Sequence, residues 1–432
     1  MDIDQFRIKH SSYVAMHGAF VASHCISDSL IFLSIGIGCK AQLPHYMGGH
    51  ELENNFVSRM GWAELDGDDI INGDVKKIRR NLLGQIERNI ANFYPVVISP
   101  VVKTIGMESL IENTAEEMRR ETGENIRMAR LSGAESDFWE GYNSIIIAFI
   151  ESMDWRSKIE KKTVNIFGYP FDRYEMEHRA NIKELRKMLA KIGIKVQAVF
   201  LSGTSTTNLQ KARKAEYNII LPHSSTIGDD IEKITGKPSI YTDIPMGISN
   251  TRQWIKQISI ALNRGKRQAQ EYLDEQKKIM EKFQGEMKST FNGVRAGLIL
   301  DLPFIGPMTS LLEGLGAEIS YIIIRDRHYG GKAKLERILK FYNEKLSHID
   351  IQESPSNDEI IRLTNENDLD LVIGSASDIS IVKRKTDAKT MIFGFPSYGK
   401  HYTDEESPFL GFEGYKNFTE EISDILNGKD QR

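Results

Sequence analysis

The chain has 432 residues, of which 40% are hydrophobic and 27% are charged, and its formal net charge is −4. These values are ordinary for a globular protein of one to three domains that builds its own core. They do not support a nucleic-acid-binding or membrane-surface protein, because both classes usually carry a basic face.

The N-terminal stretch "MDIDQFRIKHSSYVAMHGAF" opens acidic and holds no long apolar run, so we expect no signal peptide. The longest apolar runs, such as "SIIIAFI" (144–150), are far shorter than a membrane span, and no membrane segment is expected either. The two cysteines, Cys25 and Cys39, cannot form a disulfide framework, and we expect a cytoplasmic protein.

The segment "SIGIGCKAQLPHYMGGH" (34–50) places Cys39 in a glycine-rich turn ahead of two histidines. Thiolate and imidazole are ligands for iron–sulfur centres and for zinc. The composition of this turn fits a metal ligand and a packing residue equally well. Cys25 lies in "VASHCISDSLIFL" (21–33), where a small buried residue is the simpler interpretation and a metal ligand is the alternative.

Eight short runs rich in β-branched residues are predicted to be strands. They cover 95–99, 163–168, 196–201, 217–221, 294–300, 319–324, 369–374 and 390–395. Their apolar residues are continuous rather than alternating with polar ones, which is typical of parallel strands covered on both faces.

Helical periodicity occupies the segments between these strands. Apolar residues recur three and four positions apart in 177–193, 309–318, 332–346 and 357–367. The succession of strand, helix and strand indicates βαβ units with right-handed crossovers. A longer, highly charged helical stretch at 249–288 is predicted to bridge two α/β halves, its charges forming a solvated face or, alternatively, a subunit contact.

The predicted fold class is therefore α/β, with three Rossmann-like domains built on parallel sheets. We place the N-terminal domain, with its cysteine turn, at 1–155 and the second domain at 156–250. A bridging helical segment follows at 251–289, and the third domain occupies 290–432. Ligands in such folds bind at the carboxyl ends of the strands.

Common cofactor motifs are absent from the sequence. There is no G-x-x-x-x-G-K-[ST] phosphate loop, no G-x-S-x-G elbow and no H-E-x-x-H, and "GIGCKA" (36–41) lacks the third glycine of a dinucleotide fingerprint. We therefore expect that this chain binds no nucleotide.

Polar residues follow several predicted strands instead. Such turns converge on a ligand crevice in an open α/β sheet, although any single one can simply cap the next helix. In chain order, the turns supply Asp172 and Arg173, His223 and Ser224, Ser375 and Ser377, and His401.

The order of several segments resembles the nitrogenase component 1 family over nearly the whole chain. This family includes the subunits of the nitrogenase molybdenum–iron protein, their cofactor-assembly scaffold pair, and the protochlorophyllide and chlorophyllide reductase subunits. "CISDSLIFLSIGIGCKAQ" (25–42) is similar to the family segment that ends in a histidine-glycine-proline-x-glycine-cysteine turn, with Cys39 at the cysteine. The segments most similar to the family are 164–221 and 235–258, and "VIGSASD" (372–378) and 393–418 complete the C-terminal part.

The resemblance also shows where cluster ligands are missing. Cluster-bridging subunits of the family carry three cysteines in the N-terminal domain, and Cys39 matches the second. The first falls near Ser12 or Tyr13 and the third at Pro100, none of which supplies a thiolate. This depletion indicates a β-type partner subunit.

Two further positions correspond to ligands of the large nitrogenase cofactor. The cysteine that holds this cofactor falls at Pro222, beside His223, and His401 is the counterpart of its histidine. We expect Arg173 to clamp a carboxylate beside Asp172, and His401 or His223 to donate a proton. Gly38, Ser224, Ser375 and Ser377 are the candidate cofactor-binding residues.

The resemblance implies one subunit of a larger enzyme. The partner would be a homologous subunit or a second copy of this chain, and a separate P-loop ATPase with a [4Fe–4S] cluster would deliver electrons. An iron–sulfur cluster shared at the subunit interface would take Cys39 from this chain and its other ligands from the partner, since ligation needs four groups.

We expect such a complex to reduce a small molecule or a cofactor precursor. One alternative is a scaffold that holds and hands on a metallocofactor or a tetrapyrrole. The other is a non-enzymatic protein that binds a small molecule.

Overall fold

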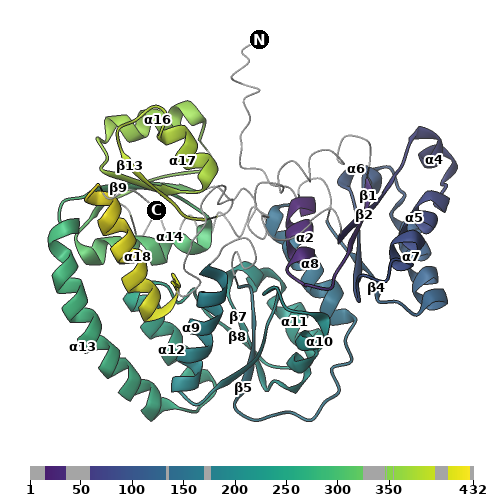
Figure 1. Cartoon of the computed structure of the whole chain (residues 1–432), viewed down its shortest axis with the longest axis horizontal. Coiled ribbons are helices and arrows are strands. Elements are labelled where there is room, and N and C mark those ends of the chain that lie inside the picture. The colour runs from purple at the N-terminus through teal and green to yellow at the C-terminus, as the bar shows by residue number, and fades with distance from the viewer. Residues whose placement is uncertain are drawn as a thin grey trace. The chain divides into compact units, whose positions relative to one another are not determined.

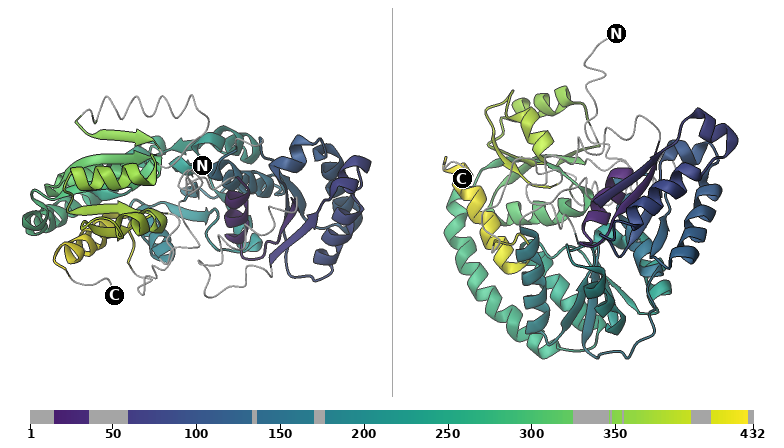
Figure 2. Two further views of the ribbon diagram at one scale, coloured as in Figure 1. Left: turned by 90° about the horizontal axis from the view of Figure 1, so that it is seen from above. Right: turned by 45° about the vertical axis from the view of Figure 1, so that its right-hand side comes forward.

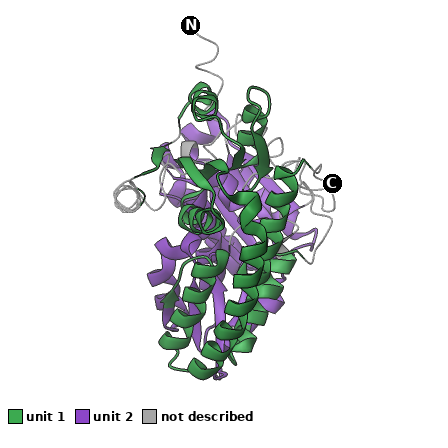
Figure 3. Ribbon diagram, turned by 90° about the vertical axis from the view of Figure 1, so that its left-hand side faces the viewer, with its two compact units in different colours: residues 1–12, 174–196, 240–432 green, residues 13–173, 197–239 purple. Residues whose placement is uncertain are grey.

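The computed structural model describes residues 15–35, 59–132, 136–169, 177–324, 346, 348–353, 355–394 and 407–428 (Figure 1). Contacts divide the chain into two compact units (Figure 3). Unit 1 comprises residues 1–12, 174–196 and 240–432, and unit 2 comprises residues 13–173 and 197–239. Within the described residues, the strands form three sheets, and helices lie between most successive strands, which confirms the predicted α/β class.

The first sheet belongs to unit 2 and has the strand order β2-β1-β3-β4, with parallel pairing throughout. Every residue of β1 and β3 is buried, which explains why their sequences show no polar alternation. The elements of this region are α2 (Ala15–His24), β1 (Ile31–Ile35), β2 (Met60–Glu64), α4 (Gly67–Asn72), α5 (Lys76–Ile86), β3 (Tyr94–Ile98), α6 (Pro100–Thr104), α7 (Glu108–Thr122), β4 (Ile126–Ala129) and α8 (Phe138–Glu151).

Helices α2 and α8 approach one another closely enough for their backbones to touch. A Cβ atom added to Gly18 would stand 1.8 Å from the carbonyl oxygen of Phe138, and one added to Gly141 would stand 1.7 Å from that of Ala15. Both positions therefore require glycine, since a side chain would force the helices apart. All ten residues of α2 are buried as a result.

The second sheet has the order β6-β5-β7-β8, and its central strands β5 and β7 pair in parallel. Two buried amides face each other across this pair: Asn165 Nδ2 donates to Asn218 Oδ1 at 3.1 Å. Burying them is tolerable because Asn165 Nδ2 also donates to the Ala212 carbonyl oxygen and Asn218 Nδ2 donates to Thr235 Oγ1. The elements are β5 (Thr163–Phe167), β6 (Lys195–Val199), α10 (Thr206–Leu209), η2 (Gln210–Lys214), β7 (Tyr217–Ile220), η3 (Pro222–Ile227), α11 (Gly228–Thr235) and β8 (Ser239–Tyr241).

The third sheet lies in unit 1 and has the order β11-β10-β9-β12-β13, again with parallel pairing. Its apolar residues pack with those of α16 and α17 into one core cluster. The elements are β9 (Arg295–Leu300), α14 (Leu302–Leu315), β10 (Glu318–Ile324), β11 (Asp350–Glu353), α16 (Asn357–Glu366), β12 (Leu371–Gly374), α17 (Ala376–Val382) and β13 (Lys389–Ile392).

The described part of unit 1 also contains the helices α9 (Glu177–Lys191), α12 (Gly247–Ala261), α13 (Lys266–Phe291) and α18 (Gly411–Leu426). The charged stretch predicted at 249–288 is thus two helices, separated by a turn in which Gly265 has a φ of 64°. Helix α13 is 26 residues long and packs along α12 and α18 (Figure 2).

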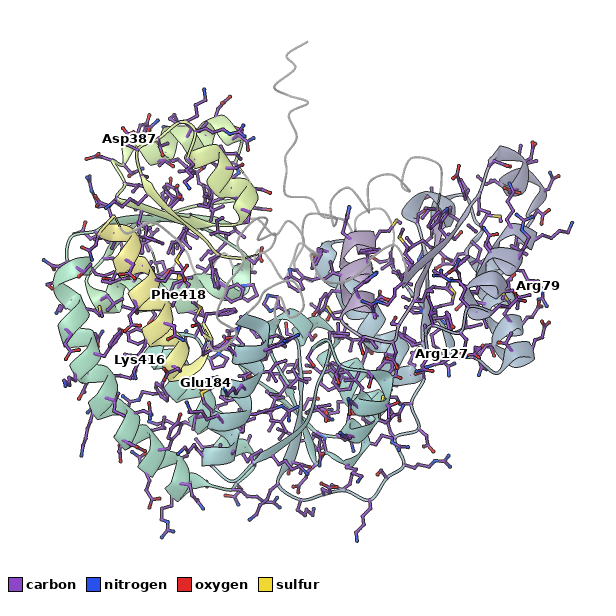
Figure 4. The ribbon with its side chains drawn as sticks, in the orientation of Figure 1. Arg79, Arg127, Glu184, Asp387, Lys416 and Phe418 are labelled. Atoms are coloured by element: carbon purple, nitrogen blue, oxygen red, sulfur yellow. The ribbon has the colours of Figure 1, made fainter. Side chains whose placement is uncertain are left out.

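Helix α9 caps the beginning of α18. Asn181 Oδ1 accepts hydrogen bonds from the backbone N–H groups of Phe409 at 2.9 Å and Leu410 at 3.0 Å. The Glu184 side chain lies against Gly411, in the first turn of α18 (Figure 4). A carboxylate and a carbonyl oxygen are therefore aimed at the positive end of the α18 dipole.

All eight predicted strands are present, and each differs from its predicted range by at most a few residues. The helices predicted at 177–193, 309–318 and 357–367 correspond to α9, the second half of α14 and α16, while 332–346 lies almost wholly outside the described residues. The three sheets fall within 1–155, 156–250 and 290–432, whereas the compact units divide the chain differently, so the three-domain division stays a prediction.

Among the described helices, none is long and apolar enough to cross a membrane.

Candidate functional site

The turn after β7 carries His223 and Ser224 at the carboxyl ends of two central parallel strands. Strand β5 ends at Phe167, and the next residue, Gly168, has a φ of 74°. A Cβ atom on Gly168 would stand 2.7 Å from both the Leu221 carbonyl oxygen and the Ser224 nitrogen. The two strand ends therefore meet through backbone atoms, which fixes the position of the 222–227 turn.

Helix α8 locks this turn through a buried amide. Asn143 Nδ2 donates to the His223 carbonyl oxygen at 2.8 Å, and Ser224 Oγ donates to Asn143 Oδ1 at 2.8 Å. His223, Ser224 and Asn143 are each at most 1% exposed. Polar groups buried this deeply need such partners, so Asn143 and Ser224 hold the turn in one conformation.

The His223 ring lies against Trp139, with their ring centroids 4.1 Å apart. Burial lowers the pKa of His223 from 6.5 to about 3, and a hydrogen bond to the Gly168 backbone opposes this shift only in part. The imidazole is therefore neutral near pH 7. In this geometry the neutral ring forms part of the packed interior.

The turn after β12 places Ser375 and Ser377 in unit 1. Ser375 is the N-cap residue of α17: its Oγ accepts from the Asp378 backbone N–H at 3.4 Å and donates to Asp378 Oδ2 at 2.7 Å. Ser377 lies in the first turn of α17, and its carbonyl oxygen accepts from Ser380 Oγ. This is the helix-capping arrangement that the sequence allowed as an alternative to cofactor binding.

Cys25 follows the last turn of α2 and is fully buried. Its carbonyl oxygen accepts from the Gly203 backbone N–H at 2.8 Å, and Arg59 donates to the carbonyl oxygens of its neighbours His24 and Ile26. In the part of the chain that the structure describes, no group of three or more His, Cys, Asp or Glu residues is placed to hold a metal. The surroundings of Cys25 therefore match a small packing residue.

Five of the ten predicted site residues lie outside the described residues: Gly38, Cys39, Asp172, Arg173 and His401. Asn181, in the second turn of the helix that follows Asp172 and Arg173, binds the backbone of Phe409 and Leu410, which follow His401.

Sequence comparison then identifies the family. The family profile described as Nitrogenase component 1 type Oxidoreductase matches residues 15–427. The chain belongs to this family. It is 26% identical over 286 residues to a subunit of the light-independent protochlorophyllide reductase of Zygnema circumcarinatum, covering 63% of this chain and 53% of the relative.

Two further comparisons extend this result. The corresponding reductase subunit of Nostoc punctiforme is 22% identical over 384 residues, covering 84% of this chain and 72% of the relative. The first such relatives are matched over only about half of their own length, 53% and 52%. A solved structure of nitrogenase Cp1 at pH 6.5 superposes with a TM-score of 0.80, at 15% identity, over 97% of this chain and 93% of its own. This likeness establishes the shared fold, a nitrogenase component 1 architecture.

Two residues that hold the candidate site together, Trp139 and Asn143, were not predicted from the sequence. Both lie on α8 in "DFWEGYNSIIIAFI" (137–150), about eighty positions before the turn that they contact. A tryptophan and an asparagine within an otherwise apolar buried helix are the signal that would have found them, since buried polar residues need a specific partner.

Proposed function

We propose that this chain is a subunit of a nitrogenase-like, iron–sulfur-dependent reductase. It would receive electrons from a P-loop ATPase that carries an iron–sulfur cluster, and the complex would reduce a small molecule or a cofactor precursor. The observation that carries this proposal is the family match across 15–427, together with the component 1 fold. The reductase names of the relatives support the same reaction class.

The distribution of cysteines limits how a cluster would be held. The sequence contains two cysteines, and iron–sulfur clusters are usually held by four ligands. Cys25 is buried among packing residues, and the described residues offer no alternative group of ligands. The described residues therefore do not fit a cluster by themselves, and the proposal is that Cys39 contributes one ligand while the partner subunit contributes the others.

We propose that the described residues of this chain act mainly by holding backbone segments in place. Asn143 and Ser224 fix the turn after β7, and Asn181 fixes the start of α18 next to the segment that carries His401. We propose that Asp172, Arg173 and His401 meet the substrate, with Arg173 pairing with a carboxylate and His401 supplying a proton. His223, neutral and packed on Trp139, is assigned a structural role.

The proposal is tested by co-purifying the chain with its genomic neighbours and supplying ATP and a low-potential reductant. A reductase converts many molecules of substrate per complex, whereas an assembly scaffold releases one bound molecule and then stops. We expect Cys39→Ala to abolish turnover without dissociating the complex. Cys25→Ala is the matched control and is expected to retain turnover. Equal turnover in the Cys39→Ala complex and the wild-type complex would remove the shared cluster from the proposal.

A further inference from the structure

A surface groove of about 850 Å³ lies among helices α12, α13, α14 and α18 of unit 1. Its volume is in the range of small-molecule sites. Ser310 and Leu311 line it from α14 in the half of that helix remote from β9, because α14 begins directly after the carboxyl end of β9. The groove is thus separate from the strand ends where Ser375 and Ser377 lie.

The charged side chains that line this groove are all cationic. Arg252 and Lys256 project from successive turns of α12, and neither forms an ion pair with any described residue. None of the described residues that line the groove is an aspartate or a glutamate. Two cations one helical turn apart, without a carboxylate beside them, favour an anionic group.

The N-terminus of α12 also favours an anionic ligand. Ile248 and Ser249, in its first turn, line the groove, and the N-cap residue Met246 provides no side-chain cap for the helix. No acidic residue occupies the first turn either. The positive end of the α12 dipole therefore acts in the same sense as the two cationic side chains.

Apolar side chains line part of the groove, together with the polar Gln253, Gln257, Gln284 and Ser310. Ile260 is 66% exposed, which is unusual for a large aliphatic residue, and Leu311 and the Tyr415 ring are buried. The Tyr415 ring is held edge-on by Phe283, with ring centroids 5.9 Å apart. A ligand with a flat apolar body would cover Ile260 and remove its surface from water.

We propose that this groove binds an organic anion with a flat apolar body. Arg252 and Lys256 hold the anionic group, Ile260 contacts the body, and the buried Leu311 and Tyr415 side chains form the floor beneath it. The proposal stands on the groove alone and does not depend on the reductase reaction.

The test uses the full chain and two probes with the same aromatic skeleton. One is 8-anilino-1-naphthalenesulfonate, which carries a sulfonate, and the other is neutral N-phenyl-1-naphthylamine. Fluorescence titration is expected to show one saturable site for the sulfonate and at least about tenfold weaker binding of the neutral probe, since charge-assisted hydrogen bonds are lost.

Variants locate the binding site. Arg252→Gln with Lys256→Gln is expected to weaken sulfonate binding at least about tenfold. Ser310→Trp fills the groove and is expected to exclude both probes. The matched control, Lys278→Gln with Lys288→Gln, removes the same charge from exposed positions on α13 outside the groove and is expected to leave binding unchanged.

Three results would overturn the proposal. The Arg252 and Lys256 variant could bind the sulfonate as tightly as wild type. The two probes could bind equally, which would make the groove a purely apolar surface. Sulfonate binding could survive Ser310→Trp while that variant keeps the wild-type circular dichroism spectrum and melting temperature, which would place the probe elsewhere.

Discussion

Two turns with similar sequences serve different purposes in this molecule. The turn after β7 reads Pro-His-Ser-Ser and is sealed: His223 and Ser224 are at most 1% exposed and are fixed by α8. The turn after β12 reads Ser-Ala-Ser-Asp and uses Ser375 as the cap of a short helix. Both are polar turns at the carboxyl ends of parallel strands. Polar residues at a strand end therefore mark a turn, and the packing around the turn decides whether it is held rigidly or begins a helix.

The largest loss of stability is expected from a substitution at Gly168, whose backbone packs against the sealed turn. Gly168→Val would place a side chain at a φ of 74° and drive it into the Leu221 carbonyl oxygen and the Ser224 nitrogen. We expect a loss of at least about 3 kcal/mol in the free energy of unfolding, from strain and overpacking. Urea denaturation measures it. Gly84→Ala, in α5 with no atom within 4 Å of the added carbon, is the control and is expected to be neutral or slightly stabilising. A Gly168→Val loss no larger than that of the control would show that the strand ends are not locked together.

The next effect comes from the amide that ties α8 to the turn. Asn143→Ala leaves the His223 carbonyl oxygen and the Ser224 hydroxyl without their partner in a buried site. We expect a loss of about 2 to 3 kcal/mol in unfolding free energy. Ser224→Ala removes only one bond and is expected to lose about 1 kcal/mol. Equal effects of the two substitutions would mean that Asn143 does not organise the turn.

Acid is expected to lower the free energy of unfolding through His223, which lies in the sealed turn. Because the pKa of His223 is lowered to about 3 in the folded chain, the unfolded chain binds more protons between pH 3 and 6.5. His223 therefore contributes stability that is fully present above pH 6.5 and is lost as the pH falls toward 3. His223→Gln is expected to be less sensitive to pH across this window in thermal melts. Parallel curves for wild type and variant would indicate that His223 becomes protonated within the fold.

The smallest effect is expected at the helix-capping turn. Ser375→Ala removes the N-cap of α17 and the partner of the Asp378 carboxylate, and we expect a loss of about 1 kcal/mol. Ser377→Ala is the control, since the hydrogen bond that the structure gives Ser377 uses its backbone carbonyl oxygen. We expect its melting temperature to match that of wild type. A larger loss at Ser377 than at Ser375 would contradict the capping role.

The fold could be predicted wherever the composition of a short segment itself shows that the segment is buried. Strands β5, β7, β9, β10 and β12 lie inside mainly apolar runs and are largely buried, so sequence and structure agree. Strands β4 and β11 escaped prediction because they lie at sheet edges, where "IRMA" and "DIQE" carry polar residues and are only partly buried. Strand β1 escaped because its apolar residues continue those of α2 with only a short turn between.

The candidate site was less predictable, since burial depends on contacts far apart in the sequence. The sequence located His223 at a strand end but gave no sign that Trp139 and Asn143 enclose it, because they come from α8, about eighty residues earlier. Cys25 could be interpreted from its apolar neighbours alone, and full burial agrees with that interpretation. The chemistry of Cys39 could not be settled in the same way, because its turn is equally suited to a ligand and to packing.

The central claim is tested most directly by measuring iron and acid-labile sulfide. The measurement is made anaerobically on the chain co-purified with its homologous partner. The shared-cluster account predicts iron and sulfide in the wild-type complex and in Cys25→Ala. It predicts that both are lost in Cys39→Ala while the two subunits remain associated. A wild-type complex that reduces its substrate but contains no iron would contradict the account, as would a Cys39→Ala complex with its full iron content.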